Sequence, residues 1–263
     1  IPIPEELSII IDTYEKQNIN KNFKDGAVKS GIFSDINRCY YVIGDKIIFW
    51  NPDEPESFQT LDLTSDITSI SLVQPKKAYF VKKITHLLTV ATKEDIQILA
   101  INTTDKNNLL VYKTELSCNL DGLEVNHFVT DASNNNIYFT TTSDTHVWEL
   151  FYDTANTKKP CYKTCITSNF ISNIIPTKFF SLLSSCSSEH FIQVTMDQTR
   201  RAISCLTNNW NLKAFQFNKN STSLKCPVVL SEEAFISRIQ KGKIARSRPA
   251  FYKIVSIVPI TKN

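Results

Sequence analysis

Short runs of β-forming residues fill the chain from residue 31 onward, and this feature limits its possible folds most strongly. Val, Ile, Thr, Phe and Tyr dominate these runs, while Asn, Asp, Gly and Lys separate them. Examples are RCYYVIG, KIIFWN, ITSISLV, HVWELFY and FIQVTMD. Many short strands at a spacing of about 8–12 residues are typical of sandwiches, barrels and propellers. The chain is therefore predicted to be all-β.

Neighbouring runs predict β-hairpins. Residues Tyr40–Ile43 pair with Ile47–Trp50, and Ile137–Thr140 pair with Val147–Tyr152, each across a polar turn. Counting the strands favours a β-propeller among the three architectures. At about 40–45 residues per blade, the chain supplies about six blades, or nearer five once long loops are subtracted. The sequence has no WD dipeptide and five glycines, so it is not an ordinary WD40 chain.

Helical periodicity occurs at two places. After two prolines, apolar residues recur at helical spacing at Leu7, Ile10, Ile11 and Tyr14. This predicts an N-terminal arm and a short helix within residues 1–30. A helical insertion is predicted over residues 231–245, where Ser231 is a natural N-cap. Its apolar face would hold Phe235, Ile236 and Ile239.

Composition narrows the classes of partner. Hydrophobic residues make up 42% of the chain, which is enough for a substantial core. The net charge of +3 is too small to indicate a nucleic-acid partner. The short basic clusters at Arg200–Arg201 and at residues 241–248 are expected to be solvated faces of loops or helices.

Seven cysteines, an odd and scattered set, indicate free thiols rather than a disulfide framework. Cys161 and Cys165 form the one close pair, and no second pair or histidine follows at the spacing of a zinc site. The sequence shows no signal peptide and no apolar run of about 20 residues. Because it begins at Ile1, we expect it to be a fragment of a longer protein.

Catalytic motifs such as G-x-S-x-G, H-E-x-x-H and the P-loop do not occur in the sequence. His86 and His127 lie inside strand-like runs, where we expect them to pack within sheets. Asp121 and Asp131 lie beside turns, where Asx hydrogen bonds account for them. The chain is therefore predicted not to be an enzyme and to bind no cofactor or metal.

Two segments resemble the N-terminal domain of the large non-FG scaffold nucleoporins of the nuclear pore inner ring. The first is GIFSDINRCYYVIGDKIIFWN, residues 31–51, and the second and more specific is LVQPKKAYFVKKITHLLTVATKEDIQILAI, residues 72–101. Weaker similarity continues to about residue 217 through Trp148–Glu149, Asp197 and Trp210.

This resemblance implies a seven-bladed β-propeller that precedes an α-helical solenoid. The chain would then hold an arm at 1–30 and, at 31–263, a propeller truncated before its last blades and the solenoid. The resemblance also implies a structural scaffold in the nuclear pore complex of the nuclear envelope. Expected partners are other inner-ring nucleoporins, linker nucleoporins and the pore membrane, with no specific nucleic acid.

Residues 167–188, TSNFISNIIPTKFFSLLSSCSS, form an amphipathic segment whose polar face is nearly uncharged. A helix of this type binds membranes by inserting bulky side chains where curvature has opened packing defects. The side chains predicted to contact membrane are Phe170, Ile171, Ile174, Ile175, Phe179, Phe180, Leu182 and Leu183. Pro176 is tolerated if the helix begins there.

Two interpretations of this segment stay open. In the first it is a membrane-binding loop between blades, which the resemblance supports because such a loop occurs in the family at this place. In the second, Phe179–Leu183 is a buried strand and the preceding residues pack on the propeller edge.

Two alternatives to the nuclear pore scaffold also stay open. One is a propeller module that binds proteins in another membrane coat or vesicle coat. The other is a hydrolytic or metal-dependent propeller enzyme, which requires acidic or histidine side chains to converge at the central channel.

Overall fold

The computed structural model describes residues 4–18, 28–104, 109–156, 158–167, 189–218, 228–231, 234 and 257–259. The chain forms two compact units. One contains residues 1–125 and 152–162, and the other contains residues 126–151 and 163–263.

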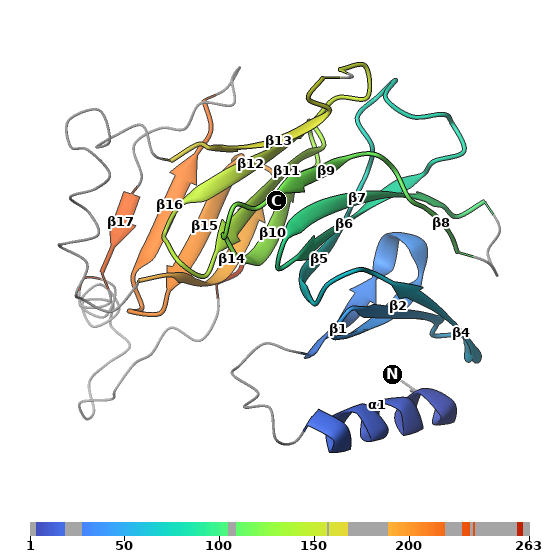
Figure 1. The fold of residues 1–263 in the computed structure, drawn as a ribbon. Helices are drawn as coiled ribbons and strands as arrows, with labels where there is room; N and C mark the ends of the chain where they lie inside the picture. Colours follow the sequence, from blue (N-terminus) through green and yellow to red (C-terminus); the bar gives the residue numbers. More distant parts are fainter. Residues whose placement is uncertain are drawn as a thin grey trace, which may run out of the picture. The chain divides into compact units, whose positions relative to one another are not determined.

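The first unit contains α1 and two antiparallel sheets (Figure 1). The first sheet has the order β1-β2-β3-β4, and the second has the order β5-β6-β7-β8, with β9 also paired to β7. The elements are α1 (Glu5–Asn18), β1 (Val28–Phe33), η1 (Ser34–Ile36), β2 (Arg38–Ile43), β3 (Lys46–Asn51), β4 (Glu54–Asp62), β5 (Ile67–Val73), β6 (His86–Thr92), β7 (Asp95–Asn102), β8 (Leu110–Tyr112) and β9 (Ser117–Asn119).

Two further sheets follow, most of whose residues belong to the second unit. Their strand orders are β10-β11-β12-β13 and β14-β15-β16-β17. The strands are β10 (Val125–Asp131), β11 (Asn136–Thr141), β12 (Val147–Tyr152), β13 (Cys161–Cys165), β14 (Phe191–Asp197), β15 (Ala202–Thr207), β16 (Leu212–Gln216) and β17 (Val228–Leu230). Each of the four sheets is thus a meander of consecutive strands, which is how a propeller blade is built.

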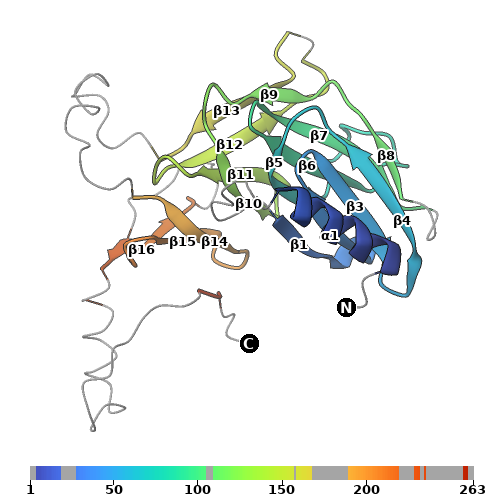
Figure 2. The same ribbon diagram turned by 60° about the horizontal axis from the view of Figure 1, so that its bottom comes forward.

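In the first sheet, β3 is buried on both faces because its side chains alternate between two cores. Ile47 and Phe49 belong to a cluster with residues of β5, β6 and β7, including Leu88 and Leu99. The intervening Ile48 and Trp50 pack with Leu7 of α1 in a second cluster, which also contains Cys39 and Ile43. The helix therefore covers the face of the β1–β4 sheet that points away from the next sheet (Figure 2).

The predicted hairpins are confirmed. Tyr40 pairs with Phe49 in the first, and Phe139 pairs with Trp148 in the second. Gly44, with φ of 56°, lies in the turn of the first hairpin, where a positive φ suits glycine. The N-terminal helix is also confirmed, although Leu7 is fully buried while Ile10 of the predicted apolar face is 41% exposed.

Other predictions have mixed outcomes. Ser231 Oγ accepts a hydrogen bond from Ala234 N at 3.2 Å, as expected of an N-cap, but the rest of the predicted helix lies outside the described residues. β1 begins at Val28, so the first strand includes residues assigned to the arm. The described residues contain four blades, and the number of blades in the whole chain stays a prediction. In the described part of the chain, no helix is long and apolar enough to cross a membrane.

A polar clasp joins β10 to the turn before β15 in the second unit. Asp131, at the end of β10, is completely buried and accepts hydrogen bonds from Ser133 N and Oγ at 3.0 and 2.5 Å. Arg201 approaches the same carboxylate to 3.0 Å, and its guanidinium lies 5.6 Å from the centre of the Phe217 ring. Gln198 Nε2 donates to Thr130 O at 2.7 Å.

This clasp confirms the Asx turn at Asp131 and corrects the expectation for Arg201. The Arg201 side chain is 21% exposed and ion-paired, rather than part of a solvated face. Burial by itself would raise the pKa of Asp131, but the hydrogen bonds from Ser133 and Arg201 outweigh it and lower that pKa below its ordinary value. A carboxyl group of this kind stabilises the fold above its unfolded pKa of about 4, and the contribution is lost as the pH falls through the folded pKa.

We therefore expect Asp131→Asn to lower the free energy of unfolding by about 3 kcal/mol at pH 7, because Arg201 loses its buried partner. The difference from the unmodified protein should shrink as the pH falls below about 4. Chemical denaturation at several pH values measures both effects. Asp66→Asn is the control, because Asp66 and its partner Lys93 are both mostly exposed. A pH-independent difference would contradict the role given to the Asp131 carboxylate.

Candidate docking surface

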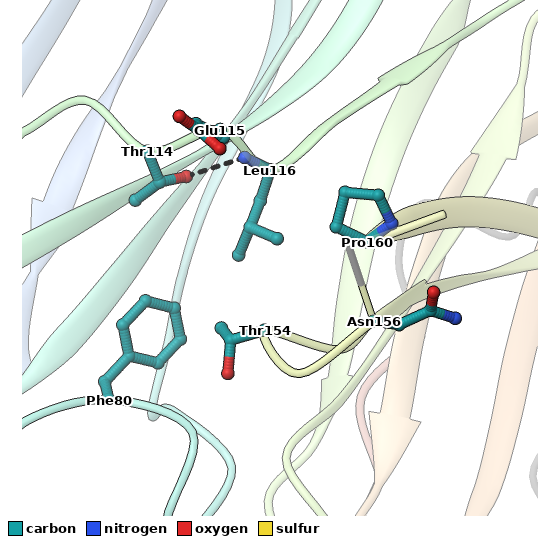
Figure 3. A pocket seen from close by; sticks show the side chains of 7 residues that line it. All are labelled: Phe80, Thr114, Glu115, Leu116, Thr154, Asn156 and Pro160. Carbon is teal, nitrogen blue, oxygen red and sulfur yellow. Dashed lines mark hydrogen bonds between the residues drawn. The ribbon is translucent and has the colours of Figure 1, made fainter. Parts of the chain in front are cut away.

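A hollow of about 300 Å³ lies among three connections of the first unit (Figure 3). We call it the hollow. Its lining combines an apolar part, formed by Phe80, Leu116 and Pro160, with a polar part. The polar part consists of Thr114, Glu115, Thr154 and Asn156. Sites at which proteins bind small ligands are usually concave, with an apolar lining and a few polar groups.

One wall of the hollow exists because the outer edge of the second sheet is interrupted. β8 and β9 both pair with β7, and residues 113–116 connect them. Thr114 Oγ1 donates to Ile98 O of β7 and accepts a hydrogen bond from Leu116 N at 3.1 Å. The threonine side chain thus replaces a backbone pairing, and the segment can leave the sheet without losing its hold on β7.

The opposite wall is the β12–β13 connection, a turn that closes on itself. Asp153 N donates to Pro160 O at 2.8 Å, which joins the two ends of the connection. Asn156 Oδ1 accepts hydrogen bonds from Lys158 N and Lys159 N, both at 3.2 Å. Side-chain oxygens of Asn commonly organise turns in this way.

Phe80 reaches the hollow from the β5–β6 connection, residues 74–85, which is anchored on Tyr152. The Tyr152 hydroxyl accepts a hydrogen bond from Lys76 N at 3.0 Å. The Tyr152 ring meets that of Tyr79 edge to face at 5.9 Å and lies 6.4 Å from that of Phe80. Thr154 Oγ1 also donates to Tyr79 O at 3.0 Å, so the two connections hold each other.

Tyr152 itself is completely buried and stays neutral. Burial raises the pKa of Tyr152 to about 12, although the hydrogen bond from Lys76 N acts in the opposite direction. A neutral hydroxyl can accept the Lys76 amide without placing a charge in the interior. The Lys76 ammonium lies 4.9 Å from the centre of the same ring, a favourable cation–π distance. Tyr152 therefore holds the β5–β6 connection through both its hydroxyl and its ring.

The two connections that hold each other are strongly basic. Together, residues 74–85 and 153–160 contain six lysines and one acid, Asp153. All of the lysines except Lys76 are exposed: Lys77, Lys82, Lys83, Lys158 and Lys159. Because the chain as a whole carries only +3, the rest of it is slightly acidic. Positive charge is thus concentrated on two of the three connections that line the hollow.

The other titratable residues predicted from the sequence lie outside the hollow. Among the described residues, no group of three or more His, Cys, Asp or Glu side chains could hold a metal ion. His86 and His127 both lie in strands, as expected, and burial lowers the pKa of His86. The five described cysteines, Cys39, Cys118, Cys161, Cys165 and Cys205, form no disulfide bond.

The eight residues predicted to contact membrane all lie within 168–188, outside the described residues. The residues on either side are attached to sheets of the second unit. Thr167 Oγ1 accepts a hydrogen bond at 3.0 Å from Val147 N, at the start of β12. Glu189 pairs with Lys213 of β16 at 3.0 Å. Residues 168–188 thus connect the sheet that ends in β13 to the sheet that begins with β14.

Sequence reasoning did not identify the hollow. Its lining comes from residues about 35 and 75 positions apart along the chain, and no motif joins them. One local signal existed, because an aromatic pair, Tyr79–Phe80, lies between two lysine pairs in KKAYFVKK. Aromatic residues are enriched at protein interfaces, and neighbouring lysines can contact aromatic faces.

Comparison with known proteins gives consistent matches. The nucleoporin family model described as "Nup133 N terminal like" matches residues 12–263. Nucleoporin NUP170 of Saccharomyces cerevisiae is 31% identical over an alignment of 265 residues, gaps included. The alignment covers 89% of this chain and 17% of that protein. A probable nucleoporin of Schizosaccharomyces pombe is 28% identical over 236 residues, or 88% of this chain and 18% of that protein. The chain therefore spans less than one fifth of the length of these relatives.

A solved structure gives the same result for the fold. The crystal structure of the Chaetomium thermophilum Nup170 NTD–Nup53 complex matches with a TM-score of 0.73 and 23% sequence identity. The match covers 94% of this chain and 33% of that chain. The predicted all-β propeller is confirmed.

The anchoring role of Tyr152 leads to a prediction. Tyr152→Phe keeps the ring contacts but removes the acceptor of Lys76 N, so we expect a loss of about 1 kcal/mol in the free energy of unfolding. Hydrogen exchange at the Lys76 amide should become faster. Tyr112→Phe, at a tyrosine that is 46% exposed, is the matched control and should change stability by less than about 0.5 kcal/mol. Unchanged exchange at Lys76 would refute the anchor.

Proposed function

The chain belongs to the nucleoporin family described as Nup133 N terminal like, and from this premise we propose that it is a structural scaffold module of the nuclear pore inner ring. Its place is the nuclear pore complex in the nuclear envelope, as the names of its relatives indicate. The module has no catalytic role and supports nucleocytoplasmic transport indirectly, by holding other proteins in position.

The observation that carries this proposal is the similarity along nearly the whole chain. The family model matches all but the first 11 residues, and the 31% identical relative covers 89% of the chain. A propeller fold alone would not indicate a function, because unrelated proteins share it. The packing supports a passive role, since blades buried on both faces make a rigid platform.

We further propose that the protein binds linker nucleoporins. Support comes from the solved Nup170 NTD, which was crystallised as a complex with Nup53. The similarity to that structure extends over 94% of this chain and 33% of the solved chain, so this chain has the fold of a part of a domain that binds a linker.

Binding of a linker nucleoporin can be measured directly. We expect the natural full-length protein to capture a Nup53-type linker nucleoporin in a pull-down, and to release it when free linker competes. A vesicle-coat protein offered in parallel is the control for specificity. Capture of the coat protein and not of the linker would contradict the proposed scaffold role.

The proposal includes contact between residues 167–188 and the curved pore membrane. The position of the segment in the chain supports it, because residues 168–188 follow β13 of one four-stranded sheet and precede β14 of the next, where a loop between blades would lie. If four large side chains insert, their burial contributes about 6–12 kcal/mol in total. Ordering about ten residues costs a comparable amount. Binding by one copy is therefore weak, and many copies in one assembly make it effective.

Liposome flotation tests the membrane contact. We expect the protein to float with small vesicles more than with large ones, because strong curvature opens packing defects. Phe179→Asp combined with Leu182→Asp should abolish flotation. The matched control is Ser181→Asp with Ser184→Asp, which adds the same charge to the polar face and should have a much smaller effect. Equal flotation of both variants and the unmodified protein would rule out insertion of this segment.

A further inference from the structure

We propose that the hollow, together with the lysines of the two connections beside it, is the docking site of a short acidic peptide segment with one large apolar side chain. The apolar side chain would lie on Phe80, Leu116 and Pro160, while acidic residues on either side would face the lysines. This inference rests on the proposed scaffold function and deepens it, because it names a surface for a protein partner and the chemistry of that partner.

The size and lining of the hollow suit a single side chain. Its volume of about 300 Å³ is at the lower end of the range for ligand pockets, so it has room for one aromatic or large aliphatic side chain and part of the adjoining peptide. Each of the three connections contributes one apolar residue to the lining, and Thr114, Thr154 and Asn156 supply polar groups for the backbone of a peptide (Figure 3). Glu115 is the one acidic residue that lines it.

The charge around the hollow indicates the sign of the partner. Five exposed lysines on two connections that contact each other create a positive field, and Asp153 and Glu115 offset only part of it. Opposite charges on a partner speed the encounter and set its orientation, whereas like charges exclude the wrong partner. The flanks of the bound segment are therefore acidic.

The connections are already held in place before a partner arrives. Tyr152 holds the β5–β6 connection through the Lys76 amide and two aromatic contacts, and Thr154 holds it through the Tyr79 carbonyl. Ala78, in the same connection, keeps a φ of 69°, which residues other than glycine rarely adopt. A surface whose loops are ordered in advance loses less conformational entropy on binding.

The shape of the site favours a peptide over a membrane surface. Insertion into lipid requires apolar side chains that project outward. Here the apolar groups line a concavity, and Phe80 and Pro160 are both half-buried. Of the large apolar residues described in the two connections, Val81 is the one that is strongly exposed, at 71%. A concave apolar site with a basic rim fits one anchor residue with acidic neighbours.

The test uses the natural full-length protein and a fluorescent 12-residue peptide made of Asp and Glu with one central Phe. Three further probes are the same peptide with Phe replaced by Ala, a version with amides in place of the acids, and vesicles of anionic lipid. We expect the Phe-containing acidic peptide to bind, each altered peptide to bind at least about tenfold more weakly, and affinity to fall with added salt.

Protein variants separate the effects of charge and of shape. Lys82→Glu with Lys83→Glu should weaken binding of the acidic peptide at least about tenfold. Lys46→Glu with Lys93→Glu makes the same change in net charge at exposed lysines at the start of β3 and in the β6–β7 turn, and should leave binding within about twofold. Glu115→Ala should strengthen binding, whereas Glu115→Trp should weaken it by filling the hollow. Unchanged thermal unfolding of each variant shows that it has folded.

Each possible result has a distinct meaning. Binding that ignores Lys82, Lys83 and Glu115, or no binding of the peptide, overturns the docking site. If a linker nucleoporin is still captured in that case, the proposed scaffold function stands without it. Attachment of anionic vesicles through Lys82 and Lys83, with no binding of the peptide, would assign the surface to lipid instead. Failure to capture any linker nucleoporin would count against the scaffold function itself.

Discussion

The burial of strands on both faces is the constraint on which the rest of the structure depends. A single four-stranded meander cannot bury two apolar faces, so each needs a neighbour on both sides. In the first unit, Ile47 and Phe49 of β3 pack towards the second sheet, while Ile48 and Trp50 pack under α1. The N-terminal helix therefore covers a sheet face that would otherwise be exposed.

The connections between strands lie outside this packing of apolar faces. Loops at the ends of rigid strands commonly carry function because the scaffold holds them in place. Tyr152 illustrates the principle, since it belongs to the end of β12 yet orders the β5–β6 connection through its hydroxyl and its ring. In the second unit, Asp131 performs a similar task, joining the end of β10 to Arg201. Buried polar groups that are hydrogen-bonded thus hold the ends of the strands in place.

The strands that could be predicted from sequence were those with local evidence. β2, β3, β11 and β12 combine apolar runs with polar turns, so their pairing could be inferred from neighbouring residues. β4 was missed because it contains Pro55 and several charged residues, which are tolerated at the outer edge of a sheet. The role of Arg201 was also missed, because its partner lies 70 residues earlier and an arginine beside a turn normally indicates a solvated surface.

The sequence by itself determined that the chain is all-β, that it forms consecutive hairpins and that it resembles a family of scaffold nucleoporins. These conclusions rest on local periodicity and on matching segments, both of which are visible in the sequence without knowledge of the fold. Only the tertiary structure decided that Phe80, Leu116 and Pro160 would share one hollow and that two lysine-bearing connections would contact each other. The physical reason is that these residues, far apart along the chain, meet only when the sheets pack together. This packing is driven by the burial of apolar surface in the sheets rather than by the loop residues that it brings together.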